Sequence, residues 1–280
     1  MNKIALITDS ISDLNKEIVD NYNIKVLPLK IIYKGKEFLD RINITPKDVY
    51  DRMPEEVPTT SLPSMDEINN LYIDLEKEDY THAIAIPVSS NLSGTFNAIK
   101  LISDDHPKIN THVFDSKLIS IGEGIIVEQC AKLISGGNPF DKIIELLPSI
   151  RDKVHLYYLV DTLEYLKKGG RIGKVSGAIG QLLNIKPIIS LDEEGTYYTV
   201  AKTRGKKQAI NKLLSIVQEI VEKCKCKVYV MHGGAEEECK KLFNVVSKFP
   251  NITSLYTGEI SPAAGVHTGP GLLGIALFEE

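Results

Sequence analysis

Short apolar runs alternate with segments of helical spacing along the first half of the chain. KIALIT, HAIAIPV and HVFD are largely apolar at consecutive positions, a pattern typical of strands buried on both faces of a parallel sheet. Helical patterns separate these runs, and the longest extends from about Ser120 to Leu133 and ends at Gly136-Gly137. This alternation of strand and helix predicts an α/β fold.

Local signals mark where several of these elements begin or turn. Thr45, followed by proline, predicts a helix start, and the sequence SMDE at Ser64 is a capping box. We expect Asp13 to cap the helix that follows the first strand. The segment IKVLPLKIIYKGKEF predicts two strands that fold back on each other over Lys34-Gly35.

The strand and helix pattern starts again near residue 154. HLYYLV predicts a strand, and KPIISLDEEGTYYTVAKTRG predicts a hairpin over Glu194-Gly195. Two longer helices and three further strands complete the chain. We therefore expect two α/β domains: residues 1–154 with a mainly parallel sheet, and residues 155–280 with a mixed sheet.

Composition changes this picture little, but it excludes some classes of function. The 280 residues are 43% hydrophobic and 25% charged, with a formal net charge of −4, which is ordinary for a soluble globular protein. A nucleic-acid surface needs a basic stripe, and the patch KKGGRIGK is too small to provide one. No apolar run reaches the length of a membrane span, and the run at the N-terminus is too short for a signal peptide, so we expect a cytoplasmic protein.

The cysteines and histidines do not form a metal-binding pattern. Cys224 and Cys226 lie where a predicted helix ends and a strand begins, and no second cysteine pair follows at zinc spacing. The histidines occur singly, without HxxxH or HxH spacing. We therefore expect no metal and no cofactor, and we interpret the cysteines as free thiols in a reducing compartment.

Four stretches rich in hydroxyl groups or glycine lie at the ends of predicted strands. They are Thr8-Asp9-Ser10, Thr59–Pro63, Ser89–Ala98 and Asp115-Ser116. In an open α/β sheet, ligands bind outside the carboxyl ends of the strands. A single stretch is explained well enough as a helix N-cap, but four together predict a ligand site.

Ser93-Gly94-Thr95 is the sharpest of these signals. Glycine lets a ligand approach the backbone, and the free N–H groups of a first helical turn carry partial positive charge. Ser93 and Thr95 add hydroxyl donors, so the stretch suits an anion such as a carboxylate or a phosphate. The chain contains neither a P-loop nor a G-x-S-x-G nucleophile elbow.

His267 lies among small residues and turn-formers in SPAAGVHTGPGLLG. It could donate a hydrogen bond to a small anion, or it could be a turn histidine with a structural hydrogen bond. Ser93 and His267 are also compatible with a serine hydrolase that acts on acyl esters, with Asp9 or Asp115 orienting the histidine. From these residues alone, two functions remain open: an anion-binding protein and a hydrolase.

Seven motifs in chain order resemble those of the DegV family: TDS, TTSLPS, SSNLSGTFNAI, DSKLISIGEG, LEYLKKGGRIG, IKPII and HTGPGLLG. The resemblance implies two α/β domains with a long-chain fatty acid, such as hexadecanoate, bound between them. It also implies the fatty-acid-binding subunit of a bacterial fatty-acid kinase, a carrier without catalysis of its own. Such a carrier presents the acyl carboxylate to a separate ATP-using kinase and carries the acyl phosphate toward phospholipid synthesis.

The same resemblance assigns roles to particular residues. It places the carboxylate on Thr60 or Ser61, on Ser93 and on His267, with Gly94 and Thr95 in the loop of Ser93. Leu62 stands where many relatives carry a polar residue, and Phe96 where tyrosine is common; both departures could change the acyl preference.

Two arginines match basic positions that the family would place near the site or on the partner surface. They are Arg171 in GGRIG and Arg204 in KTRGKK. We expect the lysines at 167, 168, 206 and 207 to be ordinary solvated charges. With no membrane segment in the sequence, we expect at most transient contact with a membrane.

Overall fold

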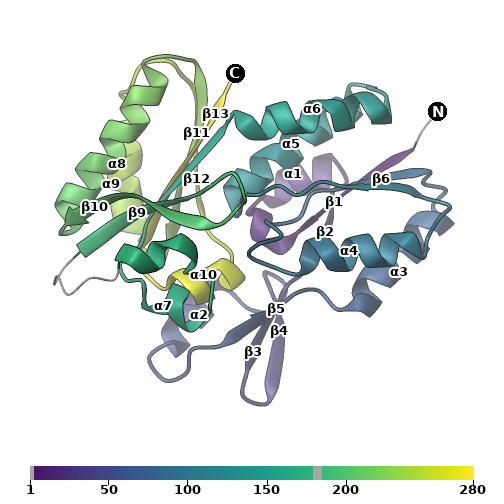
Figure 1. Ribbon diagram of the computed structural model, residues 1–280, viewed down its shortest axis with the longest axis horizontal. Coiled ribbons are helices and arrows are strands. Elements are labelled where there is room, and N and C mark those ends of the chain that lie inside the picture. The colour runs from purple at the N-terminus through teal and green to yellow at the C-terminus, as the bar shows by residue number, and fades with distance from the viewer. Residues whose placement is uncertain (1–2, 179–184) are drawn as a thin grey trace.

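A computed structural model describes residues 3–178 and 185–280 of the chain. The strands form a four-stranded, a six-stranded and a three-stranded sheet. Figure 1 shows the two larger sheets side by side, with the smallest sheet projecting below them. The predicted α/β fold, with a parallel sheet in the N-terminal half and a mixed sheet in the C-terminal half, is confirmed.

The four-stranded sheet is parallel throughout and has the order β2-β1-β6-β7. Its strands are β1 (Ile4–Asp9), β2 (Lys25–Leu27), β6 (His82–Ala85) and β7 (Asn110–Val113). Successive side chains point to opposite faces. Ala5 and Ile7 therefore pack with residues of α3 (Met65–Lys77) and α4 (Thr95–Asp104), whereas Leu6 packs with α5 (Ile121–Ser135).

Helix α5 lies between the two large sheets and contacts β1 on one side and β8 (Val154–Leu159) and β13 (Leu272–Glu279) on the other. Its sequence is apolar on every side, which is typical of a helix that is buried all round. Glycine permits the close approach: a Cβ atom at Gly124 would lie 2.2 Å from the carbonyl oxygen of Ser12. One hydrophobic core therefore continues through α5 from Leu6 to Leu156 and Phe278.

The three-stranded sheet is antiparallel and has the order β4-β3-β5. It consists of β3 (Lys30–Tyr33), β4 (Lys36–Leu39) and β5 (Thr59–Ser61), with α2 (Pro46–Arg52) between the last two in sequence. The hairpin over Lys34-Gly35 is confirmed. The segment before it was predicted as one strand but divides at Pro28, because Lys25–Leu27 joins the parallel sheet.

The six-stranded sheet has the order β10-β9-β8-β13-β11-β12, and only β11 and β12 pair in parallel. Its strands are β8 (Val154–Leu159), β9 (Ile185–Leu191), β10 (Tyr197–Arg204), β11 (Cys226–Gly233), β12 (Ile252–Glu259) and β13 (Leu272–Glu279). One face packs against α8 (Lys206–Val221) and α9 (Glu236–Val246), and the other face joins the core around α5. Its first strand begins beside the boundary that we place at residue 154.

Helix caps agree with the sequence signals at two positions and differ at a third. Thr45 and Ser64 both form capping boxes, as predicted. The expectation for Asp13 is wrong: Asp9 caps a 3-10 turn, η1 (Ser10–Ser12), and Asn15 caps α1 (Lys16–Asn21). Asp13 instead has a left-handed backbone with φ of 54° and is buried.

The remaining elements are short or lie at the edges of the sheets. They are α6 (Phe140–Asp152), α7 (Glu164–Lys168), the 3-10 turn η2 (Gly173–Ala178) and α10 (Pro262–Thr268). Among the helices of residues 3–178 and 185–280, none combines the length and the apolar run needed to cross a bilayer.

Candidate ligand-binding site

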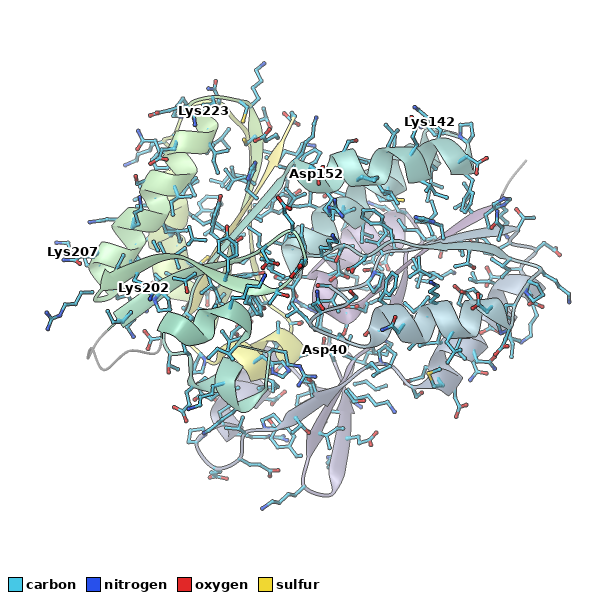
Figure 2. All side chains as sticks on the ribbon, in the orientation of Figure 1. Asp40, Lys142, Asp152, Lys202, Lys207 and Lys223 are labelled. Atoms are coloured by element: carbon cyan, nitrogen blue, oxygen red, sulfur yellow. The ribbon has the colours of Figure 1, made fainter. Side chains whose placement is uncertain are left out.

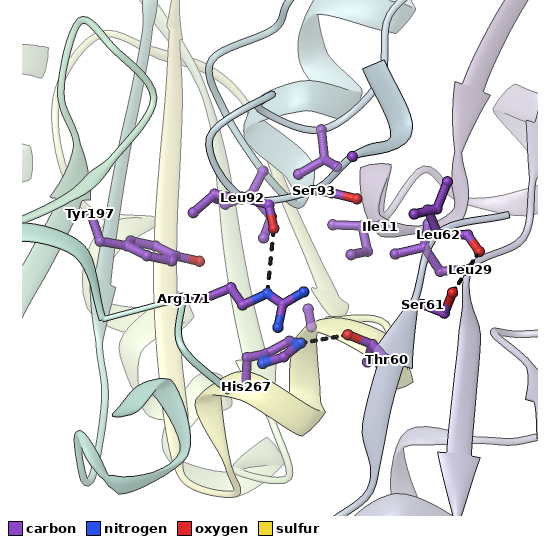
Figure 3. A pocket seen from close by; sticks show the side chains of 14 residues that line it. Ile11, Leu29, Thr60, Ser61, Leu62, Leu92, Ser93, Arg171, Tyr197 and His267 are labelled. Carbon is purple, nitrogen blue, oxygen red and sulfur yellow. Dashed lines mark hydrogen bonds between the residues drawn. The ribbon is translucent and has the colours of Figure 1, made fainter. Parts of the chain in front are cut away.

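A cavity of about 170 Å³ lies where the N-terminal half meets α10 and the segment after α7. Figure 3 shows its side chains converging from both halves of the chain. The apolar part of the lining consists of Ile11, Leu29, Leu62, Val88, Leu92, Ile119, Tyr197 and Ala264. The polar part consists of Thr60, Ser61, Ser93, Arg171 and His267, together with Gly94. The structure therefore brings together six of the residues that the sequence singled out.

Thr60 and His267 meet at the polar end of the cavity, although they are far apart in sequence. The Oγ1 atom of Thr60, on β5, lies 2.7 Å from Nε2 of His267 (Figure 3). His267 lies in the last turn of α10, a helix that the sequence analysis did not predict. Ser261 followed by Pro262 was the signal for this helix, since serine favours the N-cap and proline the first helical position.

The imidazole of His267 is almost fully enclosed. Burial and the nearby Arg171 lower the pKa of His267 to about 4, so the ring is neutral at pH 7. Its Nδ1 atom is buried and has no hydrogen-bond partner among the described residues. The backbone of Gly169 lies against this edge of the ring, because a Cβ atom there would be 2.1 Å from Nδ1.

Ser93 contributes a hydroxyl group whose position is fixed by hydrogen bonds to Thr95. The Oγ atom of Ser93 lies 2.8 Å from Oγ1 of Thr95 and accepts a hydrogen bond from the Thr95 N–H at 3.3 Å. Thr95 itself is fully buried and does not line the cavity. We therefore expect Ser93 to face a ligand, with Thr95 in a supporting position.

Arg171 brings the positive charge of the cavity lining. It follows α7, and its Nη1 atom donates to the Gly169 carbonyl at 2.6 Å while Nε donates to the Leu92 carbonyl at 3.5 Å. These bonds hold the guanidinium between His267 and the loop of Ser93 (Figure 3). Arg204 is elsewhere: it is exposed at the end of β10 and does not line this cavity.

The tip of the β9–β10 hairpin covers one side of this region. Three side chains of the N-terminal half donate hydrogen bonds to consecutive carbonyl groups of the tip, at distances of 2.5–2.9 Å. The pairs are Ser89 with Gly195, Asn91 with Glu194 and Lys117 with Glu193. Ser89 and Asn91 belong to the loop of Ser93, so the hairpin and this loop are held together beside Tyr197.

Buried carboxylates accept hydrogen bonds from backbone N–H groups that lie beside the cavity and at the start of α10. Asp9 accepts hydrogen bonds of 3.0 Å from the N–H groups of Ile11 and Val88, both of which line the cavity. Burial raises the pKa of Asp9 to about 6. Asp13 and Asp40 accept hydrogen bonds from the first turn of α10, as described below; the sequence analysis missed both roles because the partners lie more than 200 residues away.

The geometry does not assemble the catalytic groups of a serine hydrolase. Nε2 of His267 bonds to Thr60 and not to Ser93, and Nδ1 has no carboxylate partner within the described parts of the chain. Asp9 binds backbone N–H groups, and Asp115 accepts hydrogen bonds from Ser90. The residues present provide hydrogen-bond donors for an anion and no oriented base for a nucleophile.

No cluster of metal-ligating side chains was found among residues 3–178 and 185–280. Cys224 and Cys226 are free thiols whose Sγ atoms lie 3.6 Å apart.

Comparison with known proteins gives matches along nearly the whole chain. A family model described as "Uncharacterised protein, DegV family" matches residues 3–280. A DegV domain-containing protein of Clostridium acetobutylicum is 56% identical over 280 residues, which cover 100% of both chains.

Two solved structures have the same fold. A DegV family protein from Thermus thermophilus, described as binding fatty acid, has a TM-score of 0.92 at 30% identity, with 99% of this chain and 100% of that chain covered. DegV of Bacillus subtilis, described as a fatty acid binding protein, also has a TM-score of 0.92 at 30% identity, with 100% of both chains covered. The extent of the family match and the 56% identity show that this chain belongs to the DegV family.

Proposed function

We propose that the protein binds a long-chain fatty acid in the cavity and holds its carboxylate at the polar end. The observation that carries the proposal is a mainly apolar lining in which Thr60, Arg171 and a neutral His267 lie close together, while Ser93 adds a further hydroxyl group (Figure 3). A buried carboxylate needs donors or a positive charge, and this end supplies both.

The acyl chain supplies most of the affinity in this proposal, and the head group fixes the position. Burying each CH₂ group is worth ~0.8 kcal/mol before ordering costs, so the affinity rises with the number of groups that the cavity encloses. A hydrogen bond to the charged carboxylate contributes ~1.5–3 kcal/mol. Removing one donor should therefore weaken binding without abolishing it.

The Ser93→Ala variant tests where the carboxylate lies. We expect the dissociation constant of a fluorescent long-chain fatty acid to rise by about tenfold or more, because one donor to a charged group is lost. Ser149→Ala, at an exposed serine on α6, is the matched control and should bind like the wild type. Unchanged affinity in Ser93→Ala would place the head group elsewhere.

Organic extraction and mass spectrometry test the class of ligand. We expect the purified protein to release a long-chain fatty acid in about equimolar amount. Turnover of acyl esters that is lost in Ser93→Ala would instead favour a hydrolase and contradict the carrier function.

We further propose that the protein acts in the cytoplasm as the carrier for a separate ATP-dependent fatty-acid kinase. The sequence has no phosphate-cradling loop, and within residues 3–178 and 185–280 the site has donors without an oriented base. With ATP and fatty acid alone, the protein should form no acyl phosphate above the no-protein control. Addition of the kinase should start acyl phosphate formation, and product formed without the kinase would contradict the proposal.

Arg204 is the residue that we propose for contact with the kinase. It is exposed at the end of β10, and Figure 2 places Lys202 and Lys207 at the same outer edge of the molecule. Arg204→Ala should keep fatty-acid affinity within about threefold, less than ~1 kcal/mol, while acyl phosphate formation with the kinase falls sharply. A parallel loss of binding would show that Arg204 supports the cavity instead.

A further inference from the structure

A second cavity of about 190 Å³ adjoins the first at its polar end. Both cavities are lined by Thr60, Arg171 and His267, so these three side chains lie where the two cavities meet. We call the first the inner cavity and the second the outer cavity. Any group held by the shared residues from the inner side therefore has a second space directly beyond it.

The outer cavity has the charge of an anion site. Lys168 lines it together with Arg171, and none of its lining residues is acidic. The ammonium group of Lys168 pairs with Glu164 at 2.6 Å, but both side chains are more than half exposed, so this ion pair is weak. Thr59 and Thr60 add two hydroxyl groups to the lining.

The unpartnered Nδ1 atom of His267 is a second, independent observation. This atom is buried without a hydrogen-bond partner, and it lies against Gly169, which lines the outer cavity. A neutral imidazole carries one N–H and one acceptor nitrogen, and Nε2 already pairs with the hydroxyl of Thr60. When Nε2 accepts from Thr60, the remaining N–H is at Nδ1, on the side of the ring that faces Gly169.

We propose that the outer cavity is an oxyanion subsite for the phosphate group of an acyl phosphate whose acyl chain occupies the inner cavity. The position of the acyl chain rests on the proposed function. With the acyl carbonyl group beside Thr60, Arg171 and His267, the phosphate group lies in the outer cavity. Arg171 can bind it through two N–H groups, and Lys168 adds a second cation.

A stable analogue allows binding to be measured without chemistry. In (2-oxoheptadecyl)phosphonate, a CH₂ group replaces the bridging oxygen of hexadecanoyl phosphate. The dissociation constants of this analogue and of hexadecanoate are measured by displacement of a fluorescent fatty acid. Lys168→Ala should weaken the analogue by about five- to tenfold and change hexadecanoate by less than about twofold, because Lys168 faces only the outer cavity.

Two further variants control for charge and folding. Lys167→Ala removes an exposed lysine of the same helix that lines neither cavity, and it should bind both ligands like the wild type. Lys168→Arg keeps the positive charge and should restore most of the analogue's affinity. Raised salt should weaken binding of the analogue more than binding of hexadecanoate.

The results separate failure of this inference from failure of the proposed function. If wild-type protein does not bind hexadecanoate, the proposed function is wrong and the subsite has no basis. If hexadecanoate binds but Lys168→Ala leaves the affinity for the analogue unchanged, or weakens both ligands equally, the outer cavity is not a phosphate subsite.

Discussion

Replacing Asp40 by Asn should stabilise the protein above pH 7 and weaken the dependence of its stability on pH. Asp40 is 1% exposed, and both of its hydrogen bonds come from neutral donors. The Ser10 hydroxyl donates to Oδ2 at 2.6 Å, and the N–H of Ala263 in α10 donates to Oδ1 at 3.0 Å. Figure 2 shows Asp40 in the interior, beside α10.

Burial raises the pKa of Asp40 from 3.8 to about 7, despite the opposing hydrogen bonds and the nearby Arg41; the charge of Asp13 adds to the rise. A group whose pKa is higher in the folded state binds a proton more strongly there. Its contribution to stability is complete below pH ~4 and is lost as the pH rises through about 7. A pKa difference of about 3 corresponds to roughly 4 kcal/mol.

Asparagine mimics the protonated acid, because its carbonyl oxygen can accept from Ala263 and its amide can donate to Ser10. We expect the variant to have a free energy of unfolding ~1–2 kcal/mol above that of the wild type at pH 5, and ~3–4 kcal/mol above it at pH 8.5. Urea denaturation at several pH values measures both. Burial also raises the pKa values of Asp9 and Glu123, which make the stability of both the variant and the wild type depend on pH. The free energies of unfolding of the two proteins are therefore compared at the same pH.

Asp20→Asn serves as the control, because Asp20 forms an exposed ion pair with Lys16 on α1. Its effect should stay within ~0.5 kcal/mol at every pH. If Asp40→Asn is instead destabilised by the same amount at pH 5 and pH 8.5, Asp40 is ionised in the folded protein and the reasoning is wrong.

Three further variants have specific expected outcomes. Arg41→Ala leaves the buried carboxylate of Asp13 without the cation that lies 2.7 Å from it; urea denaturation should show a loss of ~2 kcal/mol, and an unchanged value would mean that this pair contributes nothing. Gly169→Ala should displace the ring of His267 and weaken fatty-acid binding about tenfold in fluorescence titration while the fold is retained; wild-type affinity would show that the ring position does not matter. Gly195→Ala places a Cβ atom 2.1 Å from Oγ of Ser89 at φ of 76°, so the melting temperature should fall by several degrees, and a wild-type melting curve would show that the hairpin contact is dispensable.

Much of the fold follows from the sequence because its causes are local. The capping boxes at Thr45 and Ser64 are hydrogen bonds between residues three apart, and the hairpin at Lys34-Gly35 depends on one turn. The apolar runs predict buried strands without knowledge of their partners. The same local signals wrongly predicted a helix cap at Asp13, because this carboxylate accepts its hydrogen bonds from Arg41 and from the N–H group of Ser261.

The candidate site was predicted as a set of residues but not as a geometry. Ser93, Thr60 and His267 were singled out by type and by motif, yet only the folded chain brings Thr60 within 2.7 Å of a histidine 207 positions away. The same is true of Arg171, whose place in the cavity depends on hydrogen bonds to Gly169 and Leu92.

The sequence by itself determined the elements, the fold class and the side chains available to bind an anion, because periodicity, capping and residue type act over a few positions. The tertiary structure decided which of these side chains share a cavity, which are buried and what their pKa values are. Those properties depend on desolvation and on contacts between residues far apart in the chain. His267 shows the difference: the sequence supplies an imidazole, and only burial beside Arg171 lowers its pKa from 6.5 to about 4, so that it stays neutral well below pH 7.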